Sequence, residues 1–492
     1  MRYRFLLTLS VILVSSLGAA SLSRAQTPAS QSLPSNSTPT AANIPQTITL
    51  DIAIKAAEAR NYTVRTANNA TRIDQYEVTR AKDNMWLPTV SATASWGYGY
   101  AFSPAATSVP VNPYVPVLTT SGDTAFAFNP NPVYQQVTSP AGSQTIAYGV
   151  SAGINLFNGG SDLARINAAE SNLNASQNTS FWTRQQTAFT VTSDYLNILR
   201  NEELIYAADT TLAEALAQLG LVQGQYQAGV VPIGQVYTQQ AVVSQDSLLL
   251  IQNNANYQNA KTTLLFELNV PPDAFASYSF NADGVDTSTS LQDRAAVDTT
   301  IRPEAIDAAI DKRPDILAQV QAIKAGGYDV DITRGALWPQ LNASLGIGGN
   351  GIGTSISDIH TDNSLSAGLS LTIPIFDKFQ NELLIDEEKV DVENDLIRLE
   401  QDVQQVRSDA ATAVNNLRAS DEALDATSSA LTAAEESFRL AEEQLRVGAG
   451  TEVNVVIAEA AVETARTNRV NAKYNWVLAQ RQLAYTLGTW NY

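Results

Sequence analysis

Residue types on which many enzymes and metal sites depend are scarce or missing in this chain. Its 492 residues include no cysteine and one histidine, His360. The lack of cysteine excludes disulfides, thiolate metal sites and thiol nucleophiles. A single imidazole in a stretch rich in Gly, Ser and Asp is typical of a solvated loop residue, so His360 is not expected to bind a metal or to act as a base. Because no Gly-x-Ser-x-Gly nucleophile motif is present either, we expect no enzyme activity, no metal and no cofactor.

Positive charge is also in short supply. The chain has 30 Lys and Arg residues against 49 Asp and Glu residues, which gives a formal net charge of −19 at pH 7. The phosphates of nucleic acid would be repelled by a surface of this sign. We therefore expect no nucleic-acid partner.

Long apolar runs are confined to the N-terminus. Two arginines and an apolar run over residues 5–14 precede a small-x-small sequence at 23–25, an order that predicts a secretory signal peptide over residues 1–25. The uncharged, Ser-, Thr- and Pro-rich residues 26–46 cannot form a packed core and predict a disordered leader. Beyond the signal no window of eighteen apolar residues remains, so we expect an exported chain without a membrane-spanning helix.

Glycine and proline are missing from two long stretches, residues 161–219 and 378–447. Nothing in them stops a helix, and each stretch predicts a helix about 100 Å long. Such a helix buries its apolar stripe only where other helices lie along its whole length. The predicted helical elements are helices 61–86 and 312–337, long helices 161–228 and 378–447, turns 229–232 and 448–451, and returning helices 233–269 and 452–487.

Charge is nearly absent from residues 84–161 and 337–376, where Asp123, Asp358 and Asp362 are expected in loops. Within these stretches apolar residues alternate with small polar ones, which predicts strands with one apolar face. The expected strands are 89–102 and 144–157, separated by a Pro-, Asn- and Thr-rich connection, and 340–348 and 364–376. An apolar band on strands of roughly ten residues suits a tilted membrane-crossing barrel, and a soluble β-sandwich is the alternative.

The two halves of the chain have the same plan. Phe157 and Phe376 are separated by 219 residues, as are Gly229 and Gly448. Equal spacing of corresponding features predicts a duplicated architecture. The expected segments are a first repeat at 47–272, a connector at 273–311 and a second repeat at 312–492.

This plan predicts an α+β membrane protein that is completed by oligomerisation. In each repeat the two shorter helices together match the long helix, which favours a cylinder wall of antiparallel helices. Each chain supplies four strands, and an open sheet edge would leave N–H and C=O groups unpaired in lipid. A dimer would close eight strands into a nearly filled barrel, whereas a trimer would close twelve strands around a lumen. The Gly-, Ser- and Thr-rich inner face favours the trimer.

The order of these elements resembles that of the TolC-like outer-membrane efflux factors. The resemblance covers residues 47–490, and its motifs recur in duplicate spacing. They are Arg313-Pro314-Asp315, Trp86-Leu87-Pro88 with Leu337-Trp338-Pro339, Leu156-Phe157-Asn158-Gly159-Gly160 with Ile375-Phe376-Asp377, and the helix ends Gln225-Tyr226-Gln227-Ala228-Gly229 and Leu445-Arg446-Val447-Gly448.

The resemblance implies a homotrimer whose twelve-stranded barrel crosses the Gram-negative outer membrane and continues as a long periplasmic helical barrel, with an equatorial region near 273–311. It implies an exit duct of a tripartite efflux or type I secretion system. Such a duct passively conducts substrates from an inner-membrane pump of the RND, ABC or MFS type, with which a periplasmic adaptor protein connects it. By the same resemblance the two helical turns contact the adaptor, although their glycines would also serve any tight helical hairpin. The turn residues are Gly229, Val230, Val231, Pro232, Val447, Gly448, Ala449, Gly450 and Thr451.

One position departs from the family pattern. TolC-like channels that narrow their tunnel with acidic rings place them just after the second turn, where this chain has Asn454 and Ile457. Glu452 and Glu459 lie nearby but out of register. We expect a periplasmic constriction at Glu452, Asn454 and Ile457 in which Asn454 and apolar neighbours take the place of an acidic gate.

A periplasmic coiled-coil scaffold or adhesive protein without a pore remains the alternative, and extraction by salt without detergent would favour it. Within the channel class, the cargo remains open among drugs, metal ions, proteins and polysaccharides. The lack of cysteine and the single histidine offer no ligands for a dedicated soft-metal path.

Overall fold

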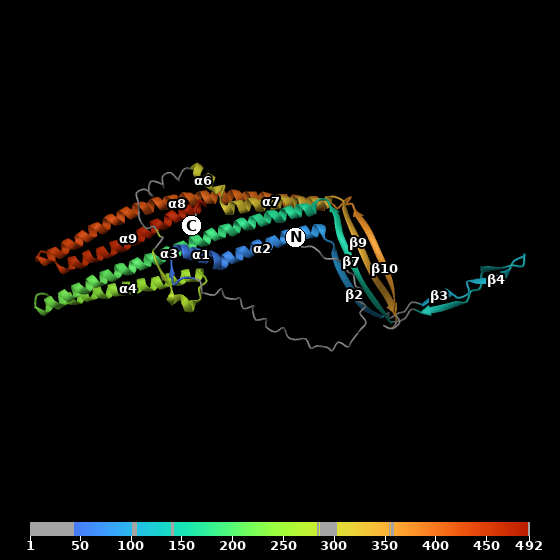
Figure 1. Cartoon of the computed structure of the whole chain (residues 1–492), viewed down its shortest axis with the longest axis horizontal. Helices are drawn as coiled ribbons and strands as arrows, with labels where there is room; N and C mark the ends of the chain where they lie inside the picture. Colours follow the sequence, from blue (N-terminus) through green and yellow to red (C-terminus); the bar gives the residue numbers. More distant parts are fainter. Residues whose placement is uncertain are drawn as a thin grey trace. The chain divides into compact units, whose positions relative to one another are not determined.

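The computed structural model of the chain describes residues 44–100, 106–138, 142–282, 285, 303–353, 355 and 359–490. The predicted signal peptide and nearly all of the predicted leader lie outside these residues. The described residues belong to a unit that begins at Ile44. More than half of the chain is helical, and its largest sheet has four strands (Figure 1).

The first elements are held by capping side chains. β1 (Thr47–Ile48) pairs in parallel with β8 (Ser279–Phe280) and is followed by α1 (Leu50–Arg60) and α2 (Tyr62–Trp86). Asn61 lies between the two helices, and its Oδ1 accepts a hydrogen bond from the Thr63 backbone N–H at 2.8 Å. Because this N-cap satisfies a free N–H group at the start of α2, a helix resumes directly after the break at Asn61.

Four strands form an antiparallel sheet in the order β10-β9-β7-β2. Their bounds are β2 (Thr89–Tyr100), β7 (Gly142–Asn158), β9 (Gln340–Gly353) and β10 (His360–Thr372). The central pair, β7 and β9, joins the two halves of the chain, with Gly149 opposite Gly348. A Cβ atom on Gly348 would lie 2.5 Å from the Tyr148 carbonyl oxygen, so the close approach of these two strands requires glycine there.

One face of this sheet is apolar and exposed in the single chain. Residues directly opposite each other in the register point to the same side, and the large apolar side chains fall on that common side. They include Val90, Trp96, Tyr98, Leu345, Ile347, Leu365, Leu369 and Leu371, all of them exposed.

The second pair of strands corrects the predicted bounds 340–348 and 364–376. β9 continues to Gly353 and β10 already begins at His360, so His360 and Asp362 lie in a strand and not in a loop. The Gly-rich residues after 348 carry no apolar alternation, but backbone pairing with β10 does not need it. β10 ends at Thr372, two residues before Pro374, which has no N–H group to donate to a neighbouring strand.

The Pro-, Asn- and Thr-rich connection between β2 and β7 contains short strands that were not predicted from the sequence. β3 (Ala106–Pro110) pairs with β6 (Tyr134–Thr138), and β4 (Tyr114–Leu118) pairs with β5 (Thr124–Phe128). Asp123 lies in the turn between β4 and β5, as expected. Prolines are tolerated in these short ribbons because each strand has one edge whose N–H groups need no partner in the sheet.

Long helices occupy the rest of the described chain (Figure 1). Their bounds are α3 (Ser161–Gln227), α4 (Ile233–Glu267), α7 (Pro314–Arg334), α8 (Gln380–Arg446) and α9 (Glu452–Thr486). Two shorter helices, α2 and α4, pack on α3, and α7 and α9 pack on α8; α7 and α9 also contact α3. The short segments η2 (Pro272–Ser277), α6 (Pro303–Ile310) and η3 (Gly335–Leu337) complete the described elements.

The hydrophobic core is centred on the middle of the long helices, near β1 and β8. Its fully buried members include Ile48, Tyr195, Ile198, Leu264, Leu417 and Trp476. The Tyr195 hydroxyl donates a hydrogen bond to the Ile48 carbonyl at 2.9 Å, so the buried polar atom has its partner.

The Arg313-Pro314-Asp315 motif fixes the start of α7 against this core. Arg313 is buried, its guanidinium pairs with the Asp315 carboxylate at 2.6 Å, and its Cζ lies 4.4 Å from the centre of the Trp182 ring. Trp182 in turn stacks on Tyr485 of α9 at 5.0 Å between ring centroids. A buried cation is tolerated here because it has both a carboxylate and an aromatic face as partners. Among the described residues, no helix is both long and apolar enough to cross a membrane.

Candidate functional site

The candidate site lies at the far ends of two helical hairpins, α3–α4 and α8–α9. Each hairpin turns at a glycine in the left-handed region, Gly229 with φ 76° and Gly448 with φ 74°. The Gly229 N–H donates to the Tyr226 carbonyl and the Gly448 N–H to the Leu445 carbonyl, at 2.9 and 3.0 Å. The next N–H group in each turn reaches one residue further back along its helix, at 2.9 and 2.8 Å. Both turns are therefore Schellman caps, which satisfy the last carbonyls of α3 and α8.

The opposite ends of α4 and α9 carry the same cap. Asn269 has φ 54° and Gly488 has φ 63°, and both donate to the carbonyl three residues before them at 2.9 Å. Their residue numbers differ by 219, the same spacing that separates Gly229 and Gly448. Asparagine at one of these sites shows that this chain accepts a residue other than glycine in a left-handed cap.

The turns present apolar side chains to their surroundings. Val230 is 71% exposed and Val447 is 67% exposed in the single chain. Pro232 and Thr451 occupy the N-cap positions of α4 and α9, and neither side chain makes a capping hydrogen bond. Exposed valines held on rigid caps are suited to contact with another protein surface.

The three residues expected at the constriction do not share one surface. Asn454 and Ile457 are exposed on α9, Ile457 by 64%. Glu452 is buried, and its Oε1 accepts a hydrogen bond from Nε2 of Gln218 on α3 at 3.0 Å. Glu452 therefore holds α9 against α3, and of the three residues only Asn454 and Ile457 are exposed.

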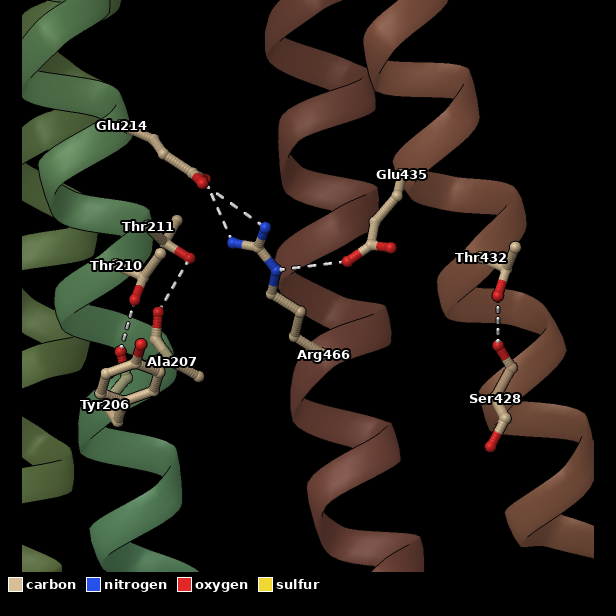
Figure 2. Close-up of polar contacts among 9 residues, drawn as sticks. All are labelled: Tyr206, Ala207, Thr210, Thr211, Glu214, Ser428, Thr432, Glu435 and Arg466. Atoms are coloured by element: carbon tan, nitrogen blue, oxygen red, sulfur yellow. Dashed lines mark hydrogen bonds and ion pairs between the residues drawn. The ribbon is translucent and has the colours of Figure 1, made fainter.

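An arginine on α9 links the two hairpins (Figure 2). The Arg466 guanidinium binds Glu214 of α3 at 3.1 Å and lies 4.0 Å from Glu435 of α8. Arg466 is largely enclosed while the two glutamates are partly exposed. Ion pairs that bridge different helices oppose their separation, in contrast to the pairs formed within one helix.

Three further carboxylates lie close together on α4 and α9. Asp246 of α4 and Glu459 and Glu463 of α9 line a cavity of about 600 Å³. Burial raises the pKa of Glu459 to about 7, and carboxylates nearby add to this effect. These neighbours are Asp246, Glu214 and Glu452. Burial likewise raises the pKa values of Asp246 and Glu463, because a charged carboxylate is less well solvated there.

Sequence reasoning missed Asp246, Glu463, Glu214 and Arg466, and it considered Glu459 only as a member of an acidic gate. A signal for Glu459 was present, since it occupies the buried face of α9 at the three- and four-residue spacing of Val455 and Val462. A charged residue within an otherwise apolar helix face predicts that its charge is buried. The seven-residue spacing of Gln239, Asp246 and Asn253, all buried on α4, is the corresponding signal on the first hairpin.

A sequence profile described as outer membrane efflux protein matches residues 53–269 and 305–489. The chain belongs to this family. Both helical hairpins and all four strands of the large sheet lie within the matched residues. The resemblance to TolC-like channels is thereby confirmed, and the protein is an outer membrane efflux protein, a member of a family that carries out transport, not catalysis.

Solved structures of similar proteins share the fold. A membrane protein from Pseudomonas aeruginosa is 17% identical with a TM-score of 0.68, over 89% of this chain and 92% of that chain. The CmeC outer membrane channel of Campylobacter jejuni is 15% identical with a TM-score of 0.67, over 89% and 85%. The outer membrane protein VceC of Vibrio cholerae is 16% identical with a TM-score of 0.66, over 89% and 96%. A comparison with curated proteins found no match.

Proposed function

We propose that three copies of this outer membrane efflux protein form the exit duct of a tripartite efflux or type I secretion system, which passively conducts substrates supplied by an inner-membrane pump. The observation that carries the proposal is the four-stranded sheet with one exposed apolar face and with β2 and β10 as its edge strands. In lipid, the N–H and C=O groups of these edges need partners. Pairing of β10 in one copy with β2 in the next supplies them and closes twelve strands around a lumen.

The helical hairpins continue this duct into the periplasm in our proposal. Their turns, residues 229–232 and 447–451, form the surface that meets a periplasmic adaptor protein, and the exposed Val230 and Val447 supply its apolar contacts. The adaptor in turn connects the duct to a pump of the RND, ABC or MFS type. Because the pump provides energy and selection, the duct itself needs only a passage that opens on contact.

The resting duct is closed by inter-hairpin contacts, and Arg466→Ala is expected to weaken them. Loss of the bridge to Glu214 and Glu435 leaves two carboxylates without their cation, which we expect to cost the closed state about 1.4 kcal/mol, or about tenfold in the open population. Single-channel recordings of the purified protein in planar bilayers measure this population. The matched control is Arg439→Ala, whose ion pair with Glu436 lies within α8 alone.

Equal open populations for wild type and Arg466→Ala would show that the bridge does not hold the duct closed. Absence of any conductance from either protein, together with extraction from membranes by salt alone, would instead support the pore-free scaffold.

The proposed constriction at Asn454 and Ile457 has no charge of its own, so multivalent cations are not expected to block the wild-type channel at low micromolar concentration. Asn454→Asp would place one carboxylate per copy, and three per trimer, at the same level. We expect the blocking concentration of a trivalent cation to fall by about tenfold or more in this variant. Conductance titrations test this, with Asn454→Ser as a neutral control. Potent block of the wild type would contradict the uncharged constriction.

A further inference from the structure

The cavity between α4 and α9 has apolar walls and an acidic side. Its lining residues recur at three- and four-residue spacing along one face of each helix, which is why they converge on one groove. Tyr237, Val242 and Val456 are the larger apolar or aromatic members. The acidic members are Asp246, Glu459 and Glu463.

Asp246 has a polar atom without a partner. Asp246 is 3% exposed, and its Oδ2 makes no hydrogen bond. Glu459, 6% exposed, lies across the groove. Arg466 is the cation of α9 that lies nearest to Glu459 in sequence. Its guanidinium already pairs with Glu214 and Glu435 of other helices. Buried carboxylates in this number require a counter-charge or protons, because a buried charge without a partner is costly.

We propose that this cavity binds a small aromatic cation, with its ammonium or amidinium group on the carboxylates of Asp246 and Glu459 and its ring against Tyr237 and Val456. The volume of about 600 Å³ is in the range of small-molecule sites. An aromatic side chain in the wall favours a cation by its ring face as well as by apolar contact. Among the residues that the structure describes, no group of His, Asp and Glu side chains has the arrangement of a metal site, which favours an organic cation over a metal ion.

Protons compete for the same carboxylates. The charged groups that face Glu459 are Glu214 of α3, Asp246 of α4, and Glu452 and Glu463 of α9. Since the pKa of Glu459 is raised to about 7, the carboxylate is mostly protonated at pH 6 and mostly charged at pH 8. Cation binding should therefore strengthen by about tenfold between these pH values, because only the charged form attracts the ligand.

The test uses the full chain purified in detergent and two fluorescent probes. The first, 9-aminoacridine, is a cation at neutral pH, and the second, acridine, has the same ring system without the charge. We expect saturable binding of 9-aminoacridine at pH 8, with one probe per chain, at least tenfold tighter than binding of acridine. The double variant Asp246→Asn with Glu459→Gln should lose this tenfold preference. The matched control, Glu400→Gln with Glu422→Gln, removes two exposed carboxylates of α8 and should leave it unchanged.

Equal affinity in the double variant, equal affinity for the two probes, or no saturable binding at either pH would overturn the proposal and assign the carboxylates to protons alone. The proposed ligand site rests on the proposed function, because it would lie in the wall of the duct. Ligand binding is nevertheless measured without pump or adaptor. Bilayer conductance of the same preparations separates the two ideas, since a channel that conducts but does not bind the probe refutes only the site.

Discussion

Gly159→Ala is expected to remove most of the folded protein from the outer membrane. Gly159 joins β7 to α3 with φ 69°, and a Cβ atom there would lie 2.5 Å from the Gly335 carbonyl oxygen and 2.6 Å from Cβ of Trp338. The left-handed backbone costs an alanine about 1–2 kcal/mol, and the clash with a backbone atom adds to this because a carbonyl cannot rotate away as a side chain can. Since the contact joins the first half of the chain to the second, the loss affects the docking of the halves.

The neighbouring glycine supplies a matched control. Gly160 has φ 90°, but a Cβ atom there would meet nothing within 4 Å. Gly160→Ala therefore carries the backbone strain without the clash and is expected to lower the amount of folded protein far less. The two variants are compared by the amount of folded protein extracted from outer membranes and by the midpoint of thermal unfolding. Equal losses would mean that strain in the turn, and not the approach of the two halves, explains both glycines.

Gly448→Pro is expected to abolish export while the protein still reaches the outer membrane in normal amounts. Proline fixes φ near −65° and has no N–H, whereas Gly448 has φ 74° and donates to the Leu445 carbonyl at 3.0 Å. The substitution therefore destroys the cap that joins α8 to α9 and displaces the adjoining Val447. A Cβ atom at Gly448 meets nothing within 4 Å, so no packing within the chain is lost.

The control for this turn comes from the chain itself. Asn269 occupies the equivalent cap position of α4 with φ 54°, so Gly448→Asn is expected to keep the turn and most of the export. Export is measured in cells whose own copy of the gene is deleted, and the assembled protein is quantified in their outer membranes. Loss of assembled protein in the proline variant would assign Gly448 to folding and not to contact with the export partner.

Much of the fold can be derived from local sequence features. The length of α8 follows from a run without glycine or proline, because only these residues, and caps, stop a helix that has favourable composition. α3 continues beyond its own such run, through Gly220 and Gly224, to the cap at Gly229. The strands with apolar alternation follow from the two-residue period of a sheet. The extension of β9 to Gly353 and the ribbons β3–β6 cannot be derived from the sequence in this way. Glycine-rich and proline-rich strands are held by backbone pairing, which does not require a regular side-chain pattern.

The sequence by itself determined the class of this protein, the positions of its two turns and the absence of acidic residues at Asn454 and Ile457, since each of these depends on neighbours along the chain. Only the tertiary structure decided that Glu452 faces α3, that Arg466 joins three helices, and that Asp246 meets Glu459. These contacts join residues that are more than 200 positions apart or lie on different helices. Their rotation about each helix axis is set by the packing of whole helices, and no local pattern records it.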